Sequence, residues 1–554
     1  MDADQEETLR LLLPIAERVI SQENDALGND ERETVPESTL SALKEVGGFG
    51  LQVPEQWGGA GLGSTQMGRL TEVIGEHDLG LGVFLTGHQG IGYKGILLVG
   101  TEEQKERYLP DLAAGRRMAA FALTEPASGS DASSISTRAE LSACGGWWEL
   151  TGGKLWITGG GLADVFTVLA KTAVRDPSTG QTKDKITAFI VERSFGGVTN
   201  GPPENKMGIR CSNTAEVWFD RTRVPAANVL GGVGQGFKVA MQILNNGRFG
   251  MGTSLSGTMR AVITKAAEHA AARRQFGAQL SAFGSVQERL ARMALLHYAT
   301  ESLAYCVAGT MDAGWEEYQI EAAVSKVFSS EAAWWVVDEA IQLLGGAGYM
   351  RSTGLEKVQR DLRIFRIFEG TNDILRLFIA LTGLQGAGAR LRELQGALRA
   401  PHRGVGLLAG EAARRVQGRP APPLLHSALT SQAATLARDV GSLGGAAERL
   451  LVRHGKGVVD QQFQLNRLAN AAIDLYVSMA VLSRCSASLE AASPSAPHEL
   501  QCAKLWCGEA SSRTRRHLAG ITAPASRYTD SQLAEISRAA CRAGGVVQPG
   551  PLGF

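Results

Sequence analysis

The 554-residue sequence predicts an α+β protein in which a compact antiparallel β domain lies between helical regions. Three observations support this fold class. Apolar residues return at helical spacing up to about residue 118, turn clusters then separate short β-branched and aromatic runs, and helical spacing resumes at Gly236. We therefore expect four parts: an N-terminal helical domain (1–118), a middle β domain (119–232), a helical bundle (233–385) and an extra helical domain (386–554).

The N-terminal region shows clear signals for helix ends. Pro36 opens one helix, which Gly47 ends, and Thr101 begins another with a capping box. A glycine-rich helix between them indicates close packing of backbones, or a ligand that lies on the helix. In that helix, His88 and Gln89 are either part of a site or core polar residues whose hydrogen bonds are satisfied.

The middle region has the composition of strands. The strand-like segments are Phe166–Ala170, Ile186–Val191 and Glu216–Phe219, each bounded by glycine- and proline-rich turns. No Gly-x-Gly-x-x-Gly motif follows any of them, which argues against a Rossmann nucleotide site.

The remaining helical region is long enough for a bundle. Its expected helices are Phe237–Asn245, Gly257–Ala272, Val286–Met311 and Ile320–Leu344. Residues 386–456 differ in charge, because they contain eleven Arg and Lys against four Asp and Glu. Apolar helical spacing resumes at Val458, and the glycine- and proline-rich tail after Gly544 is expected to be irregular.

The composition excludes several classes of protein. Lys+Arg and Asp+Glu balance at 56 each, which argues against nucleic-acid binding. Seven cysteines without a Cys-x-x-Cys pair suggest buried free thiols in a reducing compartment. Cys502 and Cys507 resemble half a metal site, but no matching partners follow, so no metal is expected. We find no run of about 18 apolar residues that would span a membrane.

One carboxylate, Glu369, lies between an apolar run and the start of a new helix. Gly370 permits a sharp turn or the close approach of a ligand. Three helix-capping residues follow: Thr371, Asn372 and Asp373. A carboxylate beside Phe368 and an apolar wall is poorly solvated, and poor solvation raises its pKa. Taken alone, the stretch is equally consistent with an acidic residue at an ordinary helix start.

Four segments in this order resemble those of the acyl-CoA dehydrogenases, flavoproteins that desaturate fatty acyl thioesters. The segments are Leu123–Asp131, Lys154–Thr158, Gln342–Gly346 and the stretch around Glu369. The resemblance covers nearly the whole chain, and the helical extension after residue 386 is similar to that of the very-long-chain branch. It implies the acyl-CoA dehydrogenase fold for the first three domains, with the extension as an extra domain for dimer formation and membrane association.

The resemblance also implies FAD as the cofactor. The residues that match the flavin loop and the following strand are Phe121, Leu123, Thr124, Gly129, Ser130, Trp156, Ile157 and Thr158. The residues that match the pyrophosphate end are Arg273, Gln275 and Phe276. The segment that reaches the adenine from a neighbouring subunit is matched by Gln342, Leu343, Gly345 and Gly346, and the positions after the base are matched by Thr371 and Asp373. A flat indole suits a flavin ring, and a guanidinium suits phosphate because it can donate two hydrogen bonds. Without the resemblance, these residues would be a turn, a core tryptophan and surface salt bridges.

The family's reaction implies roles for the remaining residues. Glu369 matches the base that removes the α-proton, and the residues that match the acyl-CoA contacts are Ser130, Asn245, Arg248 and Gly370. No side chain accepts a hydride, so the flavin must accept it. Some relatives carry the base on another helix, but the corresponding segment here, residues 247–251, has no carboxylate.

The implied function is dehydrogenation of long- or very-long-chain acyl-CoA to trans-2-enoyl-CoA, the first step of mitochondrial fatty acid β-oxidation. Electrons would pass to an electron-transfer flavoprotein. Two alternatives stay open: an acyl-CoA oxidase, and a dehydrogenase-like assembly factor for a respiratory complex. The implied location is the matrix face of the inner mitochondrial membrane. The acidic first residues are the opposite of a transit peptide, which indicates either a processed chain or another route.

The basic segment after residue 386 predicts how the protein assembles. An extra helical domain there would cover the surface through which shorter relatives form tetramers, so we expect a homodimer. Within residues 404–417 an apolar stripe is formed by Val405, Leu408, Ala409, Ala412 and Val416. Arg414 and Arg415 flank it, a pattern that suits peripheral binding to an anionic membrane. The same stripe is equally consistent with a helix that packs on its own domain.

Overall fold

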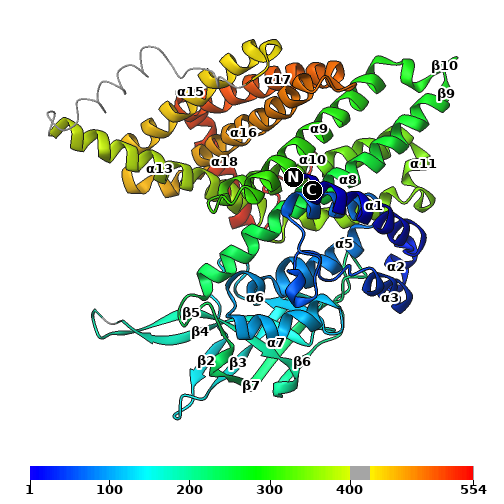
Figure 1. Cartoon of the computed structure of the whole chain (residues 1–554). Helices are drawn as coiled ribbons and strands as arrows, with labels where there is room; N and C mark the ends of the chain where they lie inside the picture. Colours follow the sequence, from blue (N-terminus) through cyan, green and yellow to red (C-terminus); the bar gives the residue numbers. More distant parts are fainter. Residues whose placement is uncertain (177, 400–424, 553–554) are drawn as a thin grey trace. The chain divides into compact units, whose positions relative to one another are not determined.

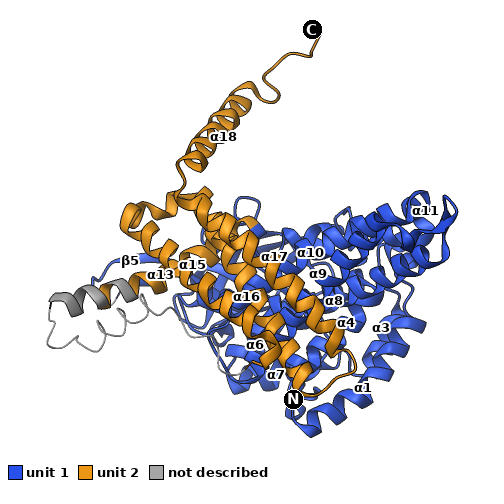
Figure 2. Cartoon of the chain, turned by 90° about the horizontal axis from the view of Figure 1, so that it is seen from above, with its two compact units in different colours: residues 1–372 blue, residues 373–554 orange. Residues whose placement is uncertain are grey.

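The computed structural model describes residues 1–176, 178–399 and 425–552. The side chains of residues 390–391 and 394–399 are not among the described parts. The chain divides into two compact units, residues 1–372 and 373–554 (Figure 2). The first unit contains helices on both sides of a β domain in sequence, and the second is helical, which confirms the predicted α+β class.

The N-terminal part of the first unit is helical throughout, as predicted. Its helices are α1 (Ala3–Gln22), α2 (Ala26–Arg32), α3 (Glu37–Glu45), α4 (Ser64–His77), α5 (Leu79–Leu85), α6 (Lys94–Val99) and α7 (Glu102–Ala113), with the short η1 (Glu55–Trp57) and the π-helix η2 (Thr86–Gly92). The capping box at Thr101 is confirmed, because its side chain accepts from the Gln104 backbone while Gln104 accepts from Thr101. The predicted helix end is confirmed too, since Gly47 follows α3 with a φ of 70°.

The middle region forms one strongly twisted sheet (Figure 1). Its strands are β1 (Ala119–Ala122), β2 (Arg138–Leu141), β3 (Trp147–Thr158), β4 (Val165–Arg175), β5 (Thr182–Glu192), β6 (Val198–Asn200), β7 (Thr214–Pro225) and β8 (Val229–Leu230). Seven of them lie in the order β6-β7-β3-β2-β4-β5-β8, and β1 pairs with β4 off this path. The expectation of a purely antiparallel sheet is wrong, because β1 and β2 both pair with β4 in parallel. One or two other strands lie between the partners in the chain, and strand composition alone does not reveal such long-range pairing.

The third part of the first unit is a helical bundle. Its main helices are α8 (Gly236–Ala272), α9 (Gly284–Asp312) and α10 (Gln319–Leu344), followed by α11 (Gly346–Tyr349), η6 (Arg351–Thr353), α12 (Leu355–Leu362) and η7 (Arg363–Arg366). The two helices expected at Phe237–Asn245 and Gly257–Ala272 are one helix, α8. The glycines between them lower helix propensity, but they let neighbours approach closely: a Cβ on Gly252 would lie 2.7 Å from Oγ of Ser325. Tertiary packing therefore outweighs local propensity here.

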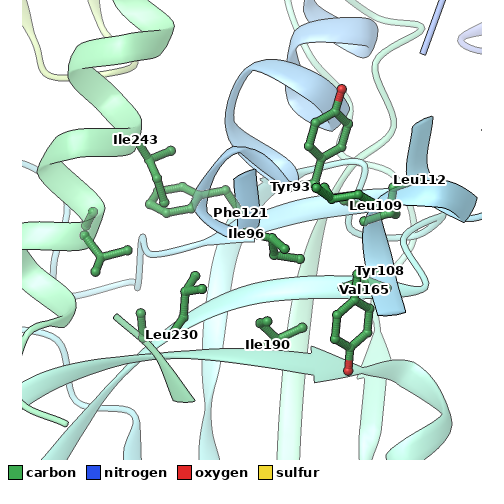
Figure 3. Close-up of a cluster of buried hydrophobic side chains, with 14 of the residues drawn as sticks. Tyr93, Ile96, Tyr108, Leu109, Leu112, Phe121, Val165, Ile190, Leu230 and Ile243 are labelled. Atoms are coloured by element: carbon green, nitrogen blue, oxygen red, sulfur yellow. The ribbon is translucent and has the colours of Figure 1, made fainter. Parts of the chain in front are cut away.

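A core of buried side chains joins the N-terminal helices to the sheet (Figure 3). Its labelled members are Tyr93, Ile96, Tyr108, Leu109, Leu112, Phe121, Val165, Ile190, Leu230 and Ile243. They come from α6 and the residue before it, α7, the sheet and the first turns of α8. In the same region both ring nitrogens of His88 are hydrogen-bonded to backbone groups, so His88 is a satisfied core residue.

The second unit is described by α13 (Asn372–Arg399), which begins at the last residue of the first unit, and by η8 (Ser427–Leu429), α15 (Thr430–His454), η9 (Gly455–Asp460), α16 (Gln462–Glu490), α17 (Ala496–Thr522) and α18 (Pro524–Ala543). Within this unit α15, α16 and α17 pack together, and α18 leads away from them (Figure 2). Residues 545–552 contain no helix or strand, as predicted. The amphipathic stretch expected at residues 404–417 lies outside the described residues.

Two expectations about composition need correction. All seven cysteines are free, but Cys144 and Cys541 are exposed rather than buried. By length and hydropathy, α16 would be apolar enough to cross a membrane, contrary to the expectation that no segment is. Its apolar stretch is 56% buried inside the unit, which is typical of a core helix.

Candidate active site

Glu369 lies in a tight turn between η7 and α13, the position predicted for it. Its φ is 54° and that of Gly370 is 92°, so two consecutive residues are left-handed. Glycine adopts this region freely, whereas a glutamate there is strained and must be held by its surroundings. The turn predicted at Gly370 is confirmed, and Glu369 shares it.

Two buried cations hold the carbonyl groups of this turn. The guanidinium of Arg248 on α8 donates to the Glu369 carbonyl from Nε and Nη2, at 3.1 and 3.0 Å. Its Nη1 donates to Oδ1 of Asn245 at 2.6 Å. Lys326 on α10 donates from Nζ to the Gly370 carbonyl at 2.8 Å. These charge-assisted hydrogen bonds are stronger than neutral ones, and they fix the backbone from two helices.

The carboxylate of Glu369 is poorly solvated. Its Oε2 is buried and has no hydrogen-bond partner among the described residues. Gly247 lies close to that oxygen, since a Cβ on it would be 3.5 Å away. Because glycine has no side chain, a substrate can still approach Oε2 past this residue. Burial raises the pKa of Glu369 to about 7, against the charges of Arg248 and Lys326, which lower it. The predicted rise in pKa is confirmed, and the value suits a general base at neutral pH.

This pKa predicts how activity depends on pH. A base works only in its deprotonated form, so turnover should fall as the pH drops through about 7. We expect kcat for the α-proton step to fall about tenfold for each unit of pH well below this pKa. Initial rates from pH 5.5 to 9 would measure this acid limb. A limb near pH 4.5, the ordinary range for glutamate, would contradict the assignment.

The structure brings the two predicted flavin segments together. In the loop after β1, a backbone bridge between Glu125 and Ser128 closes a tight turn. The backbone N–H of Leu155 on β3 donates to the Thr124 carbonyl at 2.9 Å. Ser130 is exposed, and a Cβ on Gly129 would meet nothing within 4 Å, so the backbone there is open to a ligand.

A buried ion pair connects these two segments. Nζ of Lys154 on β3 donates to Glu125 at 2.7 Å and to the carbonyls of Leu123 and Leu169 at 3.1 and 2.8 Å. Glu125 also accepts hydrogen bonds from Ser136 and from the Thr137 backbone. Burial by itself would raise the pKa of Glu125, but the charge of Lys154 and these hydrogen bonds hold it well below its usual range.

Trp156 lies at an irregularity of β3, where the pairing with β7 shifts register between Lys154 and Ile157. Its φ is 56° and 62% of the residue is exposed, so the alternative of a core tryptophan on a strand is wrong. A flat, exposed indole fits a flavin ring. Thr158 touches the glycine-rich π-helix, since a Cβ on Gly87 would lie 2.6 Å from its Cγ2.

Three predicted cofactor residues have side chains in the protein interior. Phe121 and Ile157 belong to the hydrophobic cores of the β domain, and Leu343 belongs to that of the bundle. These residues can therefore offer a cofactor their backbone groups, but not an exposed side chain. Leu123 is partly buried against the same core as Phe121.

The predicted pyrophosphate and adenine segments lie at open ends of the bundle. Gln275 is in a two-stranded hairpin of β9 (Arg274–Gln275) and β10 (Ala278–Gln279), whose turn exposes 96% of Phe276. Gly345 ends α10 with φ 59° and ψ −135°, a conformation that favours glycine, and a Cβ there would meet nothing within 4 Å. No hydrogen bond among the described residues links either segment to the loop at Thr124. Open backbone, an exposed aromatic ring and an exposed Arg273 fit an extended dinucleotide.

A cluster of three potential metal ligands lies elsewhere in the bundle. One ligand atom from each of Glu72, His297 and Glu301 lies within 4.8 Å of the others. Arg260 already bridges the two carboxylates, and Arg69 also pairs with Glu72. Because arginines supply the positive charge there, we read the cluster as an ion-pair network.

Sequence reasoning missed two residues of the site. Lys326 was not identified, although a lone lysine among small and apolar residues in a predicted helix was a usable signal. Asn372 was interpreted only as a helix cap, but its side chain accepts from Lys326 at 2.8 Å and is buried.

Comparison with known proteins identifies the family of the chain. The N-terminal, middle and C-terminal domains of acyl-CoA dehydrogenases match residues 3–116, 120–222 and 234–384, and an ACAD9/ACADV C-terminal domain matches residues 427–546. The human very long-chain specific acyl-CoA dehydrogenase is 53% identical over all of this chain and 86% of its own length. The bovine protein of the same name is 52% identical over the same shares.

Solved structures give the same result. An acyl-CoA dehydrogenase from Bacillus anthracis complexed with FAD matches with a TM-score of 0.80 at 31% identity, over 97% of this chain and 92% of that one. Butyryl-CoA dehydrogenase from Megasphaera elsdenii matches 69% of this chain and 99% of its own, with a TM-score of 0.64 at 33% identity. The fold and the matching family models define a flavin-dependent dehydrogenase. The chain belongs to the acyl-CoA dehydrogenase family, and it is an FAD-dependent enzyme that dehydrogenates acyl-CoA in fatty acid oxidation.

Proposed function

We propose that Glu369 is the catalytic base and that the substrate is a long- or very-long-chain acyl-CoA, converted to trans-2-enoyl-CoA. The observation that carries the proposal is the buried Oε2 of Glu369, which has a pKa near neutrality and no hydrogen-bond partner among the described residues. The chain-length preference is supported by 53% identity, over the full chain, to a very long-chain specific relative.

In this mechanism the protein removes one proton and positions the substrate. Oε2 of Glu369 takes the α-proton of the thioester, and charge develops on the carbonyl oxygen. When bound, FAD supplies the acceptor for the β-hydrogen, which leaves as a hydride. Thr124, Ser130, Trp156 and Thr158 would hold the flavin end of the cofactor. At its other end we place Arg273, Gln275, Phe276, Gln342, Gly345 and Gly346.

The substrate contacts expected of Asn245 and Arg248 take a different form in this proposal. Their side chains bond to each other, and the guanidinium also bonds to the Glu369 carbonyl. Both residues are buried. They would therefore act on the substrate mainly through the base turn, whereas Gly370 and Ser130 keep the direct roles expected of them.

A visible absorbance spectrum tests the function. Purified holoenzyme should be yellow, and anaerobic palmitoyl-CoA should bleach the flavin band, whereas butyryl-CoA at the same concentration should bleach it far more slowly. Failure of palmitoyl-CoA to bleach the flavin would overturn the proposed substrate class.

We propose an electron-transfer flavoprotein as the electron acceptor. A chain in a solved structure titled "Electron transferring flavoprotein of Acidaminococcus fermentans" matches 68% of this chain, with a TM-score of 0.62 at 33% identity. Rapid reoxidation of the reduced enzyme by such a flavoprotein, with little hydrogen peroxide formed in air, is the expected result. Steady peroxide production would favour the acyl-CoA oxidase alternative. Co-purification with respiratory subunits would add the assembly-factor role.

We infer a mitochondrial location, because the names of the human and bovine relatives place them in mitochondria. The finer proposals are a homodimer and peripheral contact with the matrix face of the inner membrane. Light scattering of the holoenzyme should give twice the chain mass of 58.8 kDa.

Flotation with cardiolipin-containing liposomes tests the membrane contact. The wild type should float with the vesicles, because an apolar stripe flanked by arginines binds anionic lipid. A Leu408→Glu, Arg414→Glu, Arg415→Glu variant should stay at the bottom and keep its activity in solution. Equal flotation of the two proteins would instead favour a stripe packed on its own domain.

A further inference from the structure

Lys326 is a buried ammonium group directed at the residues that follow the base. Its side chain is 0% exposed, and Nζ donates to the Gly370 carbonyl and to Oδ1 of Asn372, each at 2.8 Å. A buried charge is costly to remove from water, so such a lysine persists only where its contacts offset that cost. The Gly370 carbonyl and the Asn372 side chain follow Glu369 directly in the chain, and neither takes part in the proton transfer itself.

Asn372 extends this contact into a link between two helices. Its Nδ2 donates to Oγ of Ser330 at 3.0 Å and to Oε1 of Glu331 at 3.1 Å, both one turn beyond Lys326 on α10. The amide therefore bridges the lysine and the next turn of the same helix. Asn372 is therefore fixed to two successive turns of α10.

The turn at Glu369 and Gly370 is strained, so hydrogen bonds to both of its carbonyls are needed to hold it. Glu369 and Gly370 are both left-handed, at φ 54° and 92°, a conformation that costs free energy for a glutamate. Arg248 holds the carbonyl before Gly370, and Lys326 holds the next carbonyl. Without the second support, the turn can relax and carry the carboxylate away from its place.

We propose that Lys326 is a positioning residue for α-proton removal. By fixing the Gly370 carbonyl and Asn372, it holds Glu369 in its left-handed conformation, with the carboxylate within reach of the substrate's α-proton. The proposal rests on the assignment of Glu369 as the base. Lys326 does not touch the reacting atoms, but the position of the Glu369 carboxylate relative to the substrate depends on it.

The charge of Lys326 gives this role a distinctive signature. The charged groups that act on the Glu369 carboxylate are Arg248 from α8 and Lys326 from α10, and both lower its pKa. Glu331, also on α10, accepts a hydrogen bond from Asn372, the residue whose Oδ1 accepts from Lys326. Without the lysine charge, only Arg248 opposes the effect of burial, and the pKa of Glu369 rises further. The acid limb of activity should therefore move to higher pH.

Purified holoenzyme variants can test the proposal. Lys326→Met keeps length and apolar bulk, and it should lower kcat with palmitoyl-CoA about 10- to 100-fold, because a base misplaced by about 1 Å loses this much. Its KM and flavin content should stay close to those of the wild type, while the acid limb moves to higher pH. Lys326→Arg keeps the charge, and it should recover part of kcat with the limb near its wild-type position.

Lys94→Met is the matched control, since Lys94 is also buried but donates to the side chain of Gln52 at 2.7 Å rather than to the residues after Glu369. Its acid limb should coincide with that of the wild type. If Lys326→Met fails to fold, Lys326→Gln takes its place, because it loses the charge but keeps a donor. A folded Lys326 variant without the charge, with wild-type kcat and acid limb, overturns the proposal. If the wild type itself is not bleached by acyl-CoA, the proposed function fails instead.

Discussion

Replacement of Glu369 by glutamine should leave a folded, yellow protein whose turnover with palmitoyl-CoA is lower by about two to four orders of magnitude or more. Glutamine keeps the shape of the side chain, and the contacts of Arg248 and Lys326 go to backbone carbonyls that the change does not touch. Only the proton acceptor is lost. Anaerobic flavin bleaching in a stopped-flow instrument would measure the chemical step directly.

A matched control for this variant is Glu316→Gln, because Glu316 is exposed in the loop before α10. Its rate should equal that of the wild type. Near-normal bleaching by Glu369→Gln would remove this residue from the mechanism, and the proposed base would have to be sought elsewhere.

The same substitution should increase stability at neutral and alkaline pH. The pKa of Glu369 is about 7 in the folded protein, above the ordinary value of 4.5. The folded state therefore binds the proton more tightly, and the stability this provides is present at low pH and lost as the pH rises through about 7. Above pH 7 the variant should be more stable by on the order of 1–3 kcal/mol, with no gain below pH 4.5. Thermal unfolding at pH 5 and 8.5 would compare the two proteins.

Removal of Lys154 should cause a large loss of stability in the β domain. Lys154 and Glu125 are 0% and 1% exposed, so Lys154→Met leaves a carboxylate in the protein interior without its counter-ion. Breaking a buried pair in this way costs about 3–5 kcal/mol. Because Lys154 also holds the Leu123 carbonyl, the variant should lose FAD on dilution.

The exposed pair of Arg138 and Asp184 provides the control in the same domain. It is bidentate, at 2.8 and 2.9 Å, but its side chains are about half exposed. Arg138→Met should therefore cost only about 0–1 kcal/mol. The double variant Glu125→Gln, Lys154→Met should regain part of the loss, since no charge remains buried. Denaturant midpoints that fall equally in Lys154→Met and Arg138→Met would contradict this account.

Much of the architecture is encoded locally and could be predicted from the sequence. The helical period of the outer regions, the strand composition of the middle region and the capping box at Thr101 each depend on residues within a few positions of one another. The turn at Gly370 and the identity of Glu369 as the one candidate base in its stretch were also local. The resemblance supplied the cofactor, which no local pattern in the β domain revealed.

The tertiary structure decided the protonation behaviour of Glu369, the proposed base. Its pKa depends on burial by α8 and α10, whose Arg248 and Lys326 lie 121 and 43 positions before it in the chain. The pairing of Glu125 with Lys154, the exposure of Trp156 at a strand irregularity and the continuity of α8 through its glycines also depend on distant neighbours. Spacing along the chain encodes which residues form a helix or a strand. Solvation and electrostatic interactions are sums over every group packed nearby, so only the folded chain determines them.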